Sequence, residues 1–181
     1  IPTVGYAPQD AWSVTEKGTI VVVRGAPYRV EFIEPSGAVR LGPAQATDSR
    51  PVTMADKRRY VREFNAGTTV SGRGENGGMG RPPAVDAAEV DRFVSTMEWA
   101  SVHPAFDPSR VHLAPDGRVW VGRPAVPGQL VHYDVFDERG IRVQEVQLRA
   151  DRRVAFVGMR GVYVVADNSD GVQSIERYRT P

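Results

Sequence analysis

The 181-residue chain contains no cysteine. That absence excludes a disulfide framework, a thiolate metal site and a cysteine nucleophile. Lysine occurs only at Lys17 and Lys57, and the arginines that supply the remaining positive charge are scattered along the sequence. With 23 basic against 22 acidic residues, the chain lacks the basic excess that is typical of nucleic-acid-binding proteins. We therefore expect no nucleic acid among its partners.

Long hydrophobic runs are also missing. No apolar stretch approaches the roughly 18 residues that a membrane-spanning helix needs, so we expect no membrane span. The chain begins at Ile1 without a methionine or a signal-peptide pattern, which indicates a mature product or a fragment of a longer protein. Glycine and proline are frequent, at 18 and 14 residues, and this favours many turns and short strands over long helices.

The sequence does contain a repeated pattern of short β-rich segments. Three runs begin with glycine and continue with β-forming residues, at 18–23, 117–122 and 161–165. Each run has a short β-rich stretch before it and a tyrosine-containing strand after it. The first two units continue through a glycine turn into a fourth strand, whereas the third unit stops at Tyr178. Because Asp-Gly pairs such as Asp116-Gly117 are strong hairpin signals, the pattern predicts units of four antiparallel strands.

The spacing of these units predicts the architecture. The step from Gly117 to Gly161 is about 44 residues, which matches one four-stranded blade of a β-propeller. We therefore predict an all-β fold, a partial β-propeller of about three blades that forms one domain over residues 1–181. The missing fourth strand of the third unit leaves an unpaired sheet edge. Residues 1–6 are the candidate within this chain to complete it, and an open edge otherwise favours self-association.

A segment of different character, residues 48–109, separates the first unit from the second and predicts a helical, glycine-rich insertion. Thr53 and Asp56 resemble a capping box, and an apolar stripe then runs to an expected helix end at Gly67. A second helix is predicted to open at Asp86. A degenerate extra blade is the alternative, but the segment holds too few β-forming residues to favour it.

Two motifs inside these regions resemble known ligand sites. Residues 72–77 match the GxGxxG pattern, but prolines rather than a helix start follow them, so we interpret them as a loop and not a phosphate site. Residues 167–171 offer oxygen ligands of the kind that calcium prefers. They lack the spacing and the final glutamate of an EF-hand loop, and we predict a hairpin turn there.

Four runs of the sequence carry a resemblance to a known group, namely residues 8–14, 115–123, 133–137 and 171–178. They resemble bacterial six-bladed β-propeller proteins of the broad NHL-repeat and TolB-like group, and the helical insertion sits where these relatives carry one. The resemblance implies export to the periplasm or beyond. A ring of six such blades needs roughly 240 residues. The chain is therefore expected to be the C-terminal half of a longer protein, with two chains closing one ring as the alternative.

Site residues are predicted from the resemblance and from register. First strands line the central channel of a propeller, and the candidate channel-facing ligand residues are Asp10, His112 and Arg153. His132 is expected to be structural and His103 to lie in a loop. No nucleophile elbow or helical zinc pair is present, and no catalytic residue is assigned.

We therefore expect a binding or scaffold module that takes a protein or small-molecule ligand and needs no cofactor. One alternative is a metal-dependent propeller hydrolase or lactonase, implied by relatives that hold a divalent ion on the ring axis. Its site would be completed by blades that this chain lacks. The other alternative is a structural fragment without activity of its own.

Overall fold

The computed structural model describes residues 4–47, 50–69, 86–168 and 170–179. The chain is mostly β, and its described strands form three antiparallel sheets. It divides into two compact units, which are described separately below. One unit holds all three sheets and comprises residues 8–48 and 104–181, and the other holds both helices and comprises residues 1–7 and 49–103.

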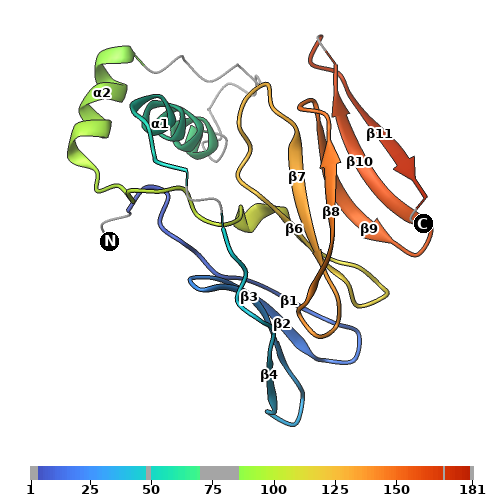
Figure 1. The fold of residues 1–181 in the computed structure, drawn as a ribbon. Helices are drawn as coiled ribbons and strands as arrows, with labels where there is room; N and C mark the ends of the chain where they lie inside the picture. Colours follow the sequence, from blue (N-terminus) through green and yellow to red (C-terminus); the bar gives the residue numbers. More distant parts are fainter. Residues whose placement is uncertain (1–3, 48–49, 70–85, 169, 180–181) are drawn as a thin grey trace. The chain divides into compact units, whose positions relative to one another are not determined.

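Each sheet is a meander in which neighbouring strands follow one another in the sequence (Figure 1). The first sheet contains β1 (Ala11–Val14), β2 (Ile20–Gly25), β3 (Tyr28–Ile33) and β4 (Val39–Leu41). After the short 3-10 helix η1 (Pro108–Arg110), the second sheet contains β5 (Val111–Leu113), β6 (Val119–Gly122), β7 (Val131–Phe136) and β8 (Arg142–Leu148). The third contains β9 (Arg152–Gly158), β10 (Gly161–Asp167) and β11 (Gln173–Tyr178). The predicted four-strand units and the shorter third unit are confirmed.

The turns of these meanders follow the predicted chemistry. Gly117 and Gly171 both have positive φ, at 83° and 76°, a conformation that glycine adopts without a Cβ penalty. At the second of these turns, Asn168 Oδ1 accepts hydrogen bonds from the amides of Asp170 (3.0 Å) and Val172 (2.7 Å). The hairpin interpretation of residues 167–171 is confirmed for the described part of the turn.

The middle sheet packs between the other two, and β5 contacts both β1 and β9. Valine and aromatic side chains fill both contacts, as expected for short strands that alternate between two buried faces. The core between the first and second sheets contains Val21, Val23, Tyr28, Val30, Phe32, Phe106, Val119, Val121 and Phe136. The core between the second and third contains Ala114, Trp120, Val131, Tyr133, Val135, Val154, Val157, Val162 and Val164.

Backbones of the first two sheets come close at a pair of glycines. A Cβ placed on Gly140, in the turn between β7 and β8, would lie 2.8 Å from Gly42 Cα, and one placed on Gly42 would lie equally near Gly140 Cα. Gly140 also has a positive φ of 73°. Only residues without a side chain allow this contact, because a Cβ at either position would overlap backbone atoms.

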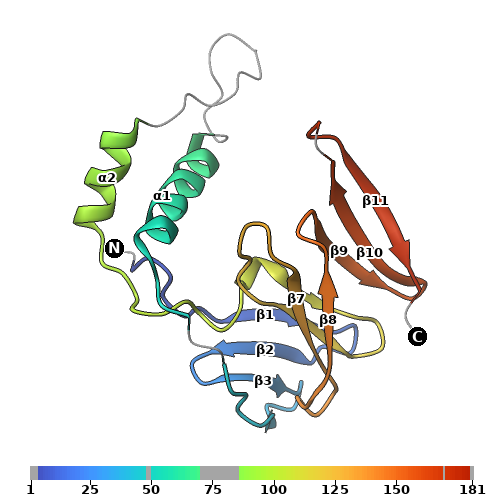
Figure 2. The same ribbon diagram turned by 45° about the horizontal axis from the view of Figure 1, so that its top comes forward.

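The helical unit contains α1 (Met54–Thr69) and α2 (Ala87–Thr96), which lie side by side in Figure 2. Both predicted helix starts are confirmed, and Asp86 caps α2 by accepting a hydrogen bond from the amide of Ala88. The predicted end at Gly67 is wrong, because α1 continues to Thr69. The two helices bury Val61, Val90 and Val94 against each other.

The N-terminal segment lies with the helical unit. Gly5 forms a parallel bridge with Trp99, and its amide donates to the carbonyl of Glu98 (2.8 Å). The expectation that residues 1–6 complete the third sheet is wrong for the described residues of that segment, and β11 remains an edge strand there. The GxGxxG motif at residues 72–77 lies outside the described residues. No helix in the described part of the chain is long and apolar enough to cross a membrane.

Candidate functional site

An acidic residue recurs at the fourth position of the third strand in every sheet. These residues are Glu31 in β3, Asp134 in β7 and Glu176 in β11. Each carboxylate is held by an arginine of its own sheet: Arg24 Nε donates to Glu31 (2.7 Å), Arg123 Nη2 to Asp134 (2.7 Å) and Arg152 Nη2 to Glu176 (2.9 Å). Arginine suits this task because its planar fork matches a carboxylate. The position of the carboxylate is shared by the three sheets, whereas its arginine comes from β2, from the residue after β6 and from β9.

The middle carboxylate also joins two sheets. Asp134 is 1% exposed and accepts a hydrogen bond from Tyr28 Oη of the first sheet (3.0 Å). Burial and the neighbouring carboxylate raise the pKa of the Tyr28 phenol, so it stays protonated and donates. Arg142 approaches the same carboxylate at 3.4 Å. With its donors supplied by protein groups, Asp134 holds the sheets together and is not free to act on a ligand.

The polar contacts of Asp134 continue through Arg123 and Glu145 to His132, nearer the solvent. The second guanidinium contact of Arg123 is to Glu145 (2.7 Å), and His132 Nδ1 lies 2.9 Å from the same carboxylate. The hydrogen bond with His132 is the main cause that lowers the pKa of Glu145 to about 2. His132 therefore has a local partner in the same sheet, which supports the predicted structural role.

A groove of about 740 Å³ lies between the first and second sheets, at the end where the β1–β2 and β5–β6 hairpins turn. Its volume falls within the range of small-molecule sites. The lining is rich in carboxylates, with Glu16, Glu34, Asp116 and Glu138 set against the cations Lys17 and Arg40. Asp116 is paired with Arg118 (3.5 Å), and the remaining excess of negative charge in a concave site attracts a cationic ligand.

Some of the charged groups in this groove are already paired. Glu34 accepts hydrogen bonds from Thr19 Oγ1 (2.8 Å) and Arg40 Nη2 (3.1 Å). Glu16 and Glu138 have no hydrogen-bond or ion-pair partner among the described side chains, and Glu16 is exposed. These two carboxylates are therefore the groups best able to bind a cation entering the groove.

The three predicted channel-facing residues each have their own local surroundings. Asp10 accepts from Arg24 Nη1 (2.7 Å) and from the amide of Gly25 (3.0 Å), and the backbone hydrogen bond is the main reason that its pKa is lowered. Arg153, in β9, pairs with Asp167 (3.0 Å). No hydrogen bond or ion pair joins any two of Asp10, His112 and Arg153, although β1, which begins directly after Asp10, contacts β5, and β5 contacts β9. Their role as ligand residues stays a prediction.

His112 differs from the other two because part of it is buried without a partner. It lies in β5, paired with Trp120, and its ring is 6.3 Å from that of Tyr133. Its Nε2 is buried and has no hydrogen-bond partner among the described residues. Burial lowers the pKa of His112, so the ring is neutral at pH 7. His112 is thus a partly buried, neutral side chain of the second sheet, and its role as a ligand residue stays a prediction.

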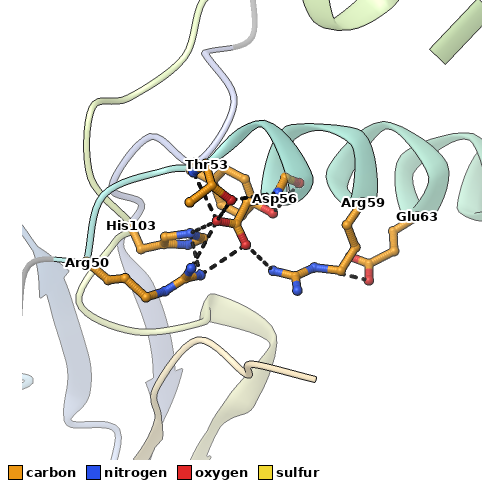
Figure 3. A network of polar contacts seen from close by, with 7 residues as sticks. Arg50, Thr53, Asp56, Arg59, Glu63 and His103 are labelled. Carbon is orange, nitrogen blue, oxygen red and sulfur yellow. Dashed lines mark hydrogen bonds and ion pairs between the residues drawn. The ribbon is translucent and has the colours of Figure 1, made fainter. Parts of the chain in front are cut away.

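A second polar cluster, which the sequence did not reveal, surrounds Asp56 in the helical unit (Figure 3). Asp56 is 4% exposed and sits at the start of α1. Its carboxylate accepts hydrogen bonds from Arg50 (2.9 and 3.1 Å) and Arg59 (3.0 Å), and from both the amide (3.0 Å) and the hydroxyl (2.6 Å) of Thr53. The expected capping box is confirmed, since Thr53 Oγ1 accepts from the Asp56 amide (3.2 Å).

His103 completes the Asp56 cluster. It is buried, and its Nε2 lies 3.2 Å from Asp56 Oδ2 and within hydrogen-bond reach of Arg50 Nη2. Burial lowers the pKa of His103, whereas the hydrogen bonds from Arg50 and Thr53 hold the pKa of Asp56 far below its ordinary value. The amide of His103 donates to the carbonyl of Arg50 (2.8 Å), so the cluster fastens the two ends of the segment 50–103 to each other.

The Asp56 cluster resembles a charge-paired histidine of a catalytic site, but its geometry favours a structural role. The Tyr6 ring covers that of His103 at 4.5 Å, and Tyr6 Oη donates to the carbonyl of Asp56 (3.0 Å). The remaining ring nitrogen, His103 Nδ1, is buried without a partner among the described residues. A general base must reach a substrate proton, and this nitrogen is enclosed.

Within the described ranges, no group of three or more His, Cys, Asp or Glu side chains is arranged to hold a metal ion. No protein-family model, curated protein or solved structure matches this chain.

Proposed function

We propose that this chain is a binding module of the β-propeller type, and that the groove between its first two sheets takes a cationic group. Three observations support a blade-like architecture. The sheets follow one another as four-stranded or three-stranded meanders, and their first strands contact in the order β1, β5, β9. A carboxylate held by an arginine of the same sheet recurs at the fourth position of the third strand in each.

One observation supports the ligand class, namely the unpaired carboxylates of the groove. Glu16 and Glu138 lie at a concave site of about 740 Å³ in which acidic groups exceed basic ones by two. A lysine or arginine side chain of a partner, or a small polyamine, offers the complementary charge. Asp134 and the Asp56–His103 pair, the buried charged groups nearest to catalytic arrangements in the described residues, are held in structural networks, so binding rather than catalysis is favoured.

The groove hypothesis is tested by titrating isotope-labelled protein with three ligands and following amide shifts by NMR. The ligands are a short lysine- and arginine-containing peptide, spermidine, and a matched peptide with glutamine in place of the basic residues. We expect the amide resonances of residues 13–19 and 113–117 to shift with the two cationic ligands and not with the glutamine peptide. If the basic peptide saturates the groove and spermidine does not, the ligand is a protein partner. If spermidine saturates it and the peptide does not, the ligand is a small molecule.

Charge variants make the NMR titration specific. Glu16→Gln and Glu138→Gln are each expected to weaken binding of the cationic ligand about two- to fivefold, the range for exposed ion pairs of a few tenths to one kcal/mol. Glu98→Gln, an exposed carboxylate in the helical unit, is the matched control and should leave binding unchanged. Equal affinity for the glutamine peptide, or no effect of either groove variant, would overturn the proposal.

A further inference from the structure

The two outer sheets each present an apolar face that the internal packing leaves uncovered. The first sheet packs on the second, and the second packs on the third. In both of these internal contacts, one face of the earlier sheet, here called its forward face, packs on the opposite face, here called the backward face, of the later sheet. The forward face is the one that carries Val30 in the first sheet and Tyr133 in the second, and the backward face carries Glu31 and Asp134. The third sheet's forward face and the first sheet's backward face are the two surfaces left over.

Strand register shows which residues of these leftover faces correspond to buried ones. Val30, Tyr133 and Ile175 all precede the recurring carboxylate in their strands, and the first two are 0% exposed. Ile175 is 70% exposed. Phe156 and Tyr163, cross-strand partners stacked at 4.2 Å on the same forward face, extend this apolar surface, and Phe156 is 50% exposed.

The backward face of the first sheet is exposed along β1 and β4, whereas Val22 (8% exposed) and Glu31 (3% exposed) in its middle are buried. Two cross-strand rows cross it, and their apolar members are Trp12, Val22 and Leu41 in one and Val14, Ile20, Ile33 and Val39 in the other. Trp12 is 72% exposed and Leu41 is 55% exposed. At the position of Ile20, which is 37% exposed, the second sheet has Val119 at 1%. Exposed apolar side chains gathered on one face of a sheet are typical of interaction sites.

We infer that two copies of this chain associate head to tail, with the forward face of the third sheet of each copy covering the backward face of the first sheet of the other. A head-to-tail contact forms a closed assembly only if the rotation returns to the start, and a dimer with two such contacts is the smallest closed assembly. A second copy is the occupant that supplies both missing faces at once. The inference rests on the sheet faces and not on the ligand of the groove.

The test is the mass of the 181-residue chain by native mass spectrometry and sedimentation velocity between 1 and 100 μM. We expect a dimer. Trp12→Glu and Ile175→Asp, both on exposed side chains, should each raise the dimer dissociation constant about a hundredfold, as expected for central apolar interface residues. Met159→Asp is the control, because Met159 is 86% exposed but lies in the β9–β10 turn and not on either face. Circular dichroism verifies that each variant is folded.

Mixing the two face variants tests the head-to-tail geometry. In a homodimer of either variant, both contacts carry a substitution. In a mixed pair, one contact joins the unaltered third sheet of the Trp12→Glu chain to the unaltered first sheet of the Ile175→Asp chain. A heterodimer should therefore form more tightly than either variant's homodimer. If one variant alone dimerises as well as the unaltered chain, the contact is symmetric and the head-to-tail arrangement is wrong. A monomer at 100 μM, or an assembly larger than a dimer, would also overturn the inference.

Discussion

Replacing Asp134 with asparagine should be among the most damaging single changes in the sheet unit. The substitution keeps the size of the side chain but removes the charge that Arg123 contacts at 2.7 Å and that Tyr28 Oη contacts at 3.0 Å. Removing one partner of a buried ion pair costs about 3–5 kcal/mol. Arg123 is 28% exposed and keeps Glu145 as a second partner, which reduces the loss. We expect a decrease in unfolding free energy of about 2–3 kcal/mol.

The measurement is urea unfolding followed by fluorescence of Trp120, which is buried in the second sheet. Replacing Trp12 and Trp99 with phenylalanine leaves Trp120 as the only tryptophan, so the signal reports on the sheet unit. Asp116→Asn is the matched control, because Asp116 is 57% exposed and an asparagine keeps its turn hydrogen bond to the Arg118 amide. Its effect should stay within about 0.5 kcal/mol.

A double-mutant cycle with Tyr28→Phe isolates the bond between the sheets. Tyr28→Phe alone should cost about 1–2 kcal/mol, because it removes a hydrogen bond to a charged acceptor. In the Asp134→Asn background it should cost about 1 kcal/mol less, since residues in contact are coupled. A loss below about 1 kcal/mol for Asp134→Asn, or additive effects of the two changes, would refute the reasoning that this carboxylate joins the sheets.

Three further predictions concern single contacts. Tyr133→Phe removes the acceptor of the buried amide of Val154 (3.0 Å) and should lower the unfolding free energy by about 1–3 kcal/mol in the same urea assay. Gly140→Ala should lower it by at least 1 kcal/mol more than Gly128→Ala, because both have positive φ but only Gly140 meets backbone within 3 Å; equal losses would contradict the close approach. The folded-state pKa of His103 is lowered, so its contribution to stability is present above about pH 6.5 and is lost as the pH falls. Thermal unfolding from pH 8 to 5 should show this decline, and His103→Gln should remove it.

Much of the fold could be predicted because its signals are local. The glycines after Asp116 and Asp170 predicted hairpins, since positive φ is a property of the residue itself. Thr53 and Asp56 predicted a helix start for the same reason. The helix end at Gly67 was predicted wrongly, because an intrinsic preference against glycine is worth only about 1 kcal/mol and α1 continues past it.

The candidate site was less accessible from the sequence. Asp10, His112 and Arg153 were chosen by their offsets from the repeating glycines, and offsets give no side-chain partners. Glu16 and Glu138 were not predicted as a pair, because they lie 122 positions apart and meet only through the packing of two sheets. A comparison of charged residues at equal positions in the predicted third strands would have found the recurring carboxylates.

The sequence by itself determined the strands, the turns and the two helix starts, because these depend on residues a few positions apart. It also determined the charge balance and the lack of cysteine, which restrict the chemistry available to the chain. Only the tertiary structure decided which face of each sheet is buried, since a neighbouring sheet covers Tyr133 but none among the described residues covers Ile175. It likewise brought Arg50, Asp56 and His103 together. Contacts of this kind depend on chain closure over long distances, which no local pattern records.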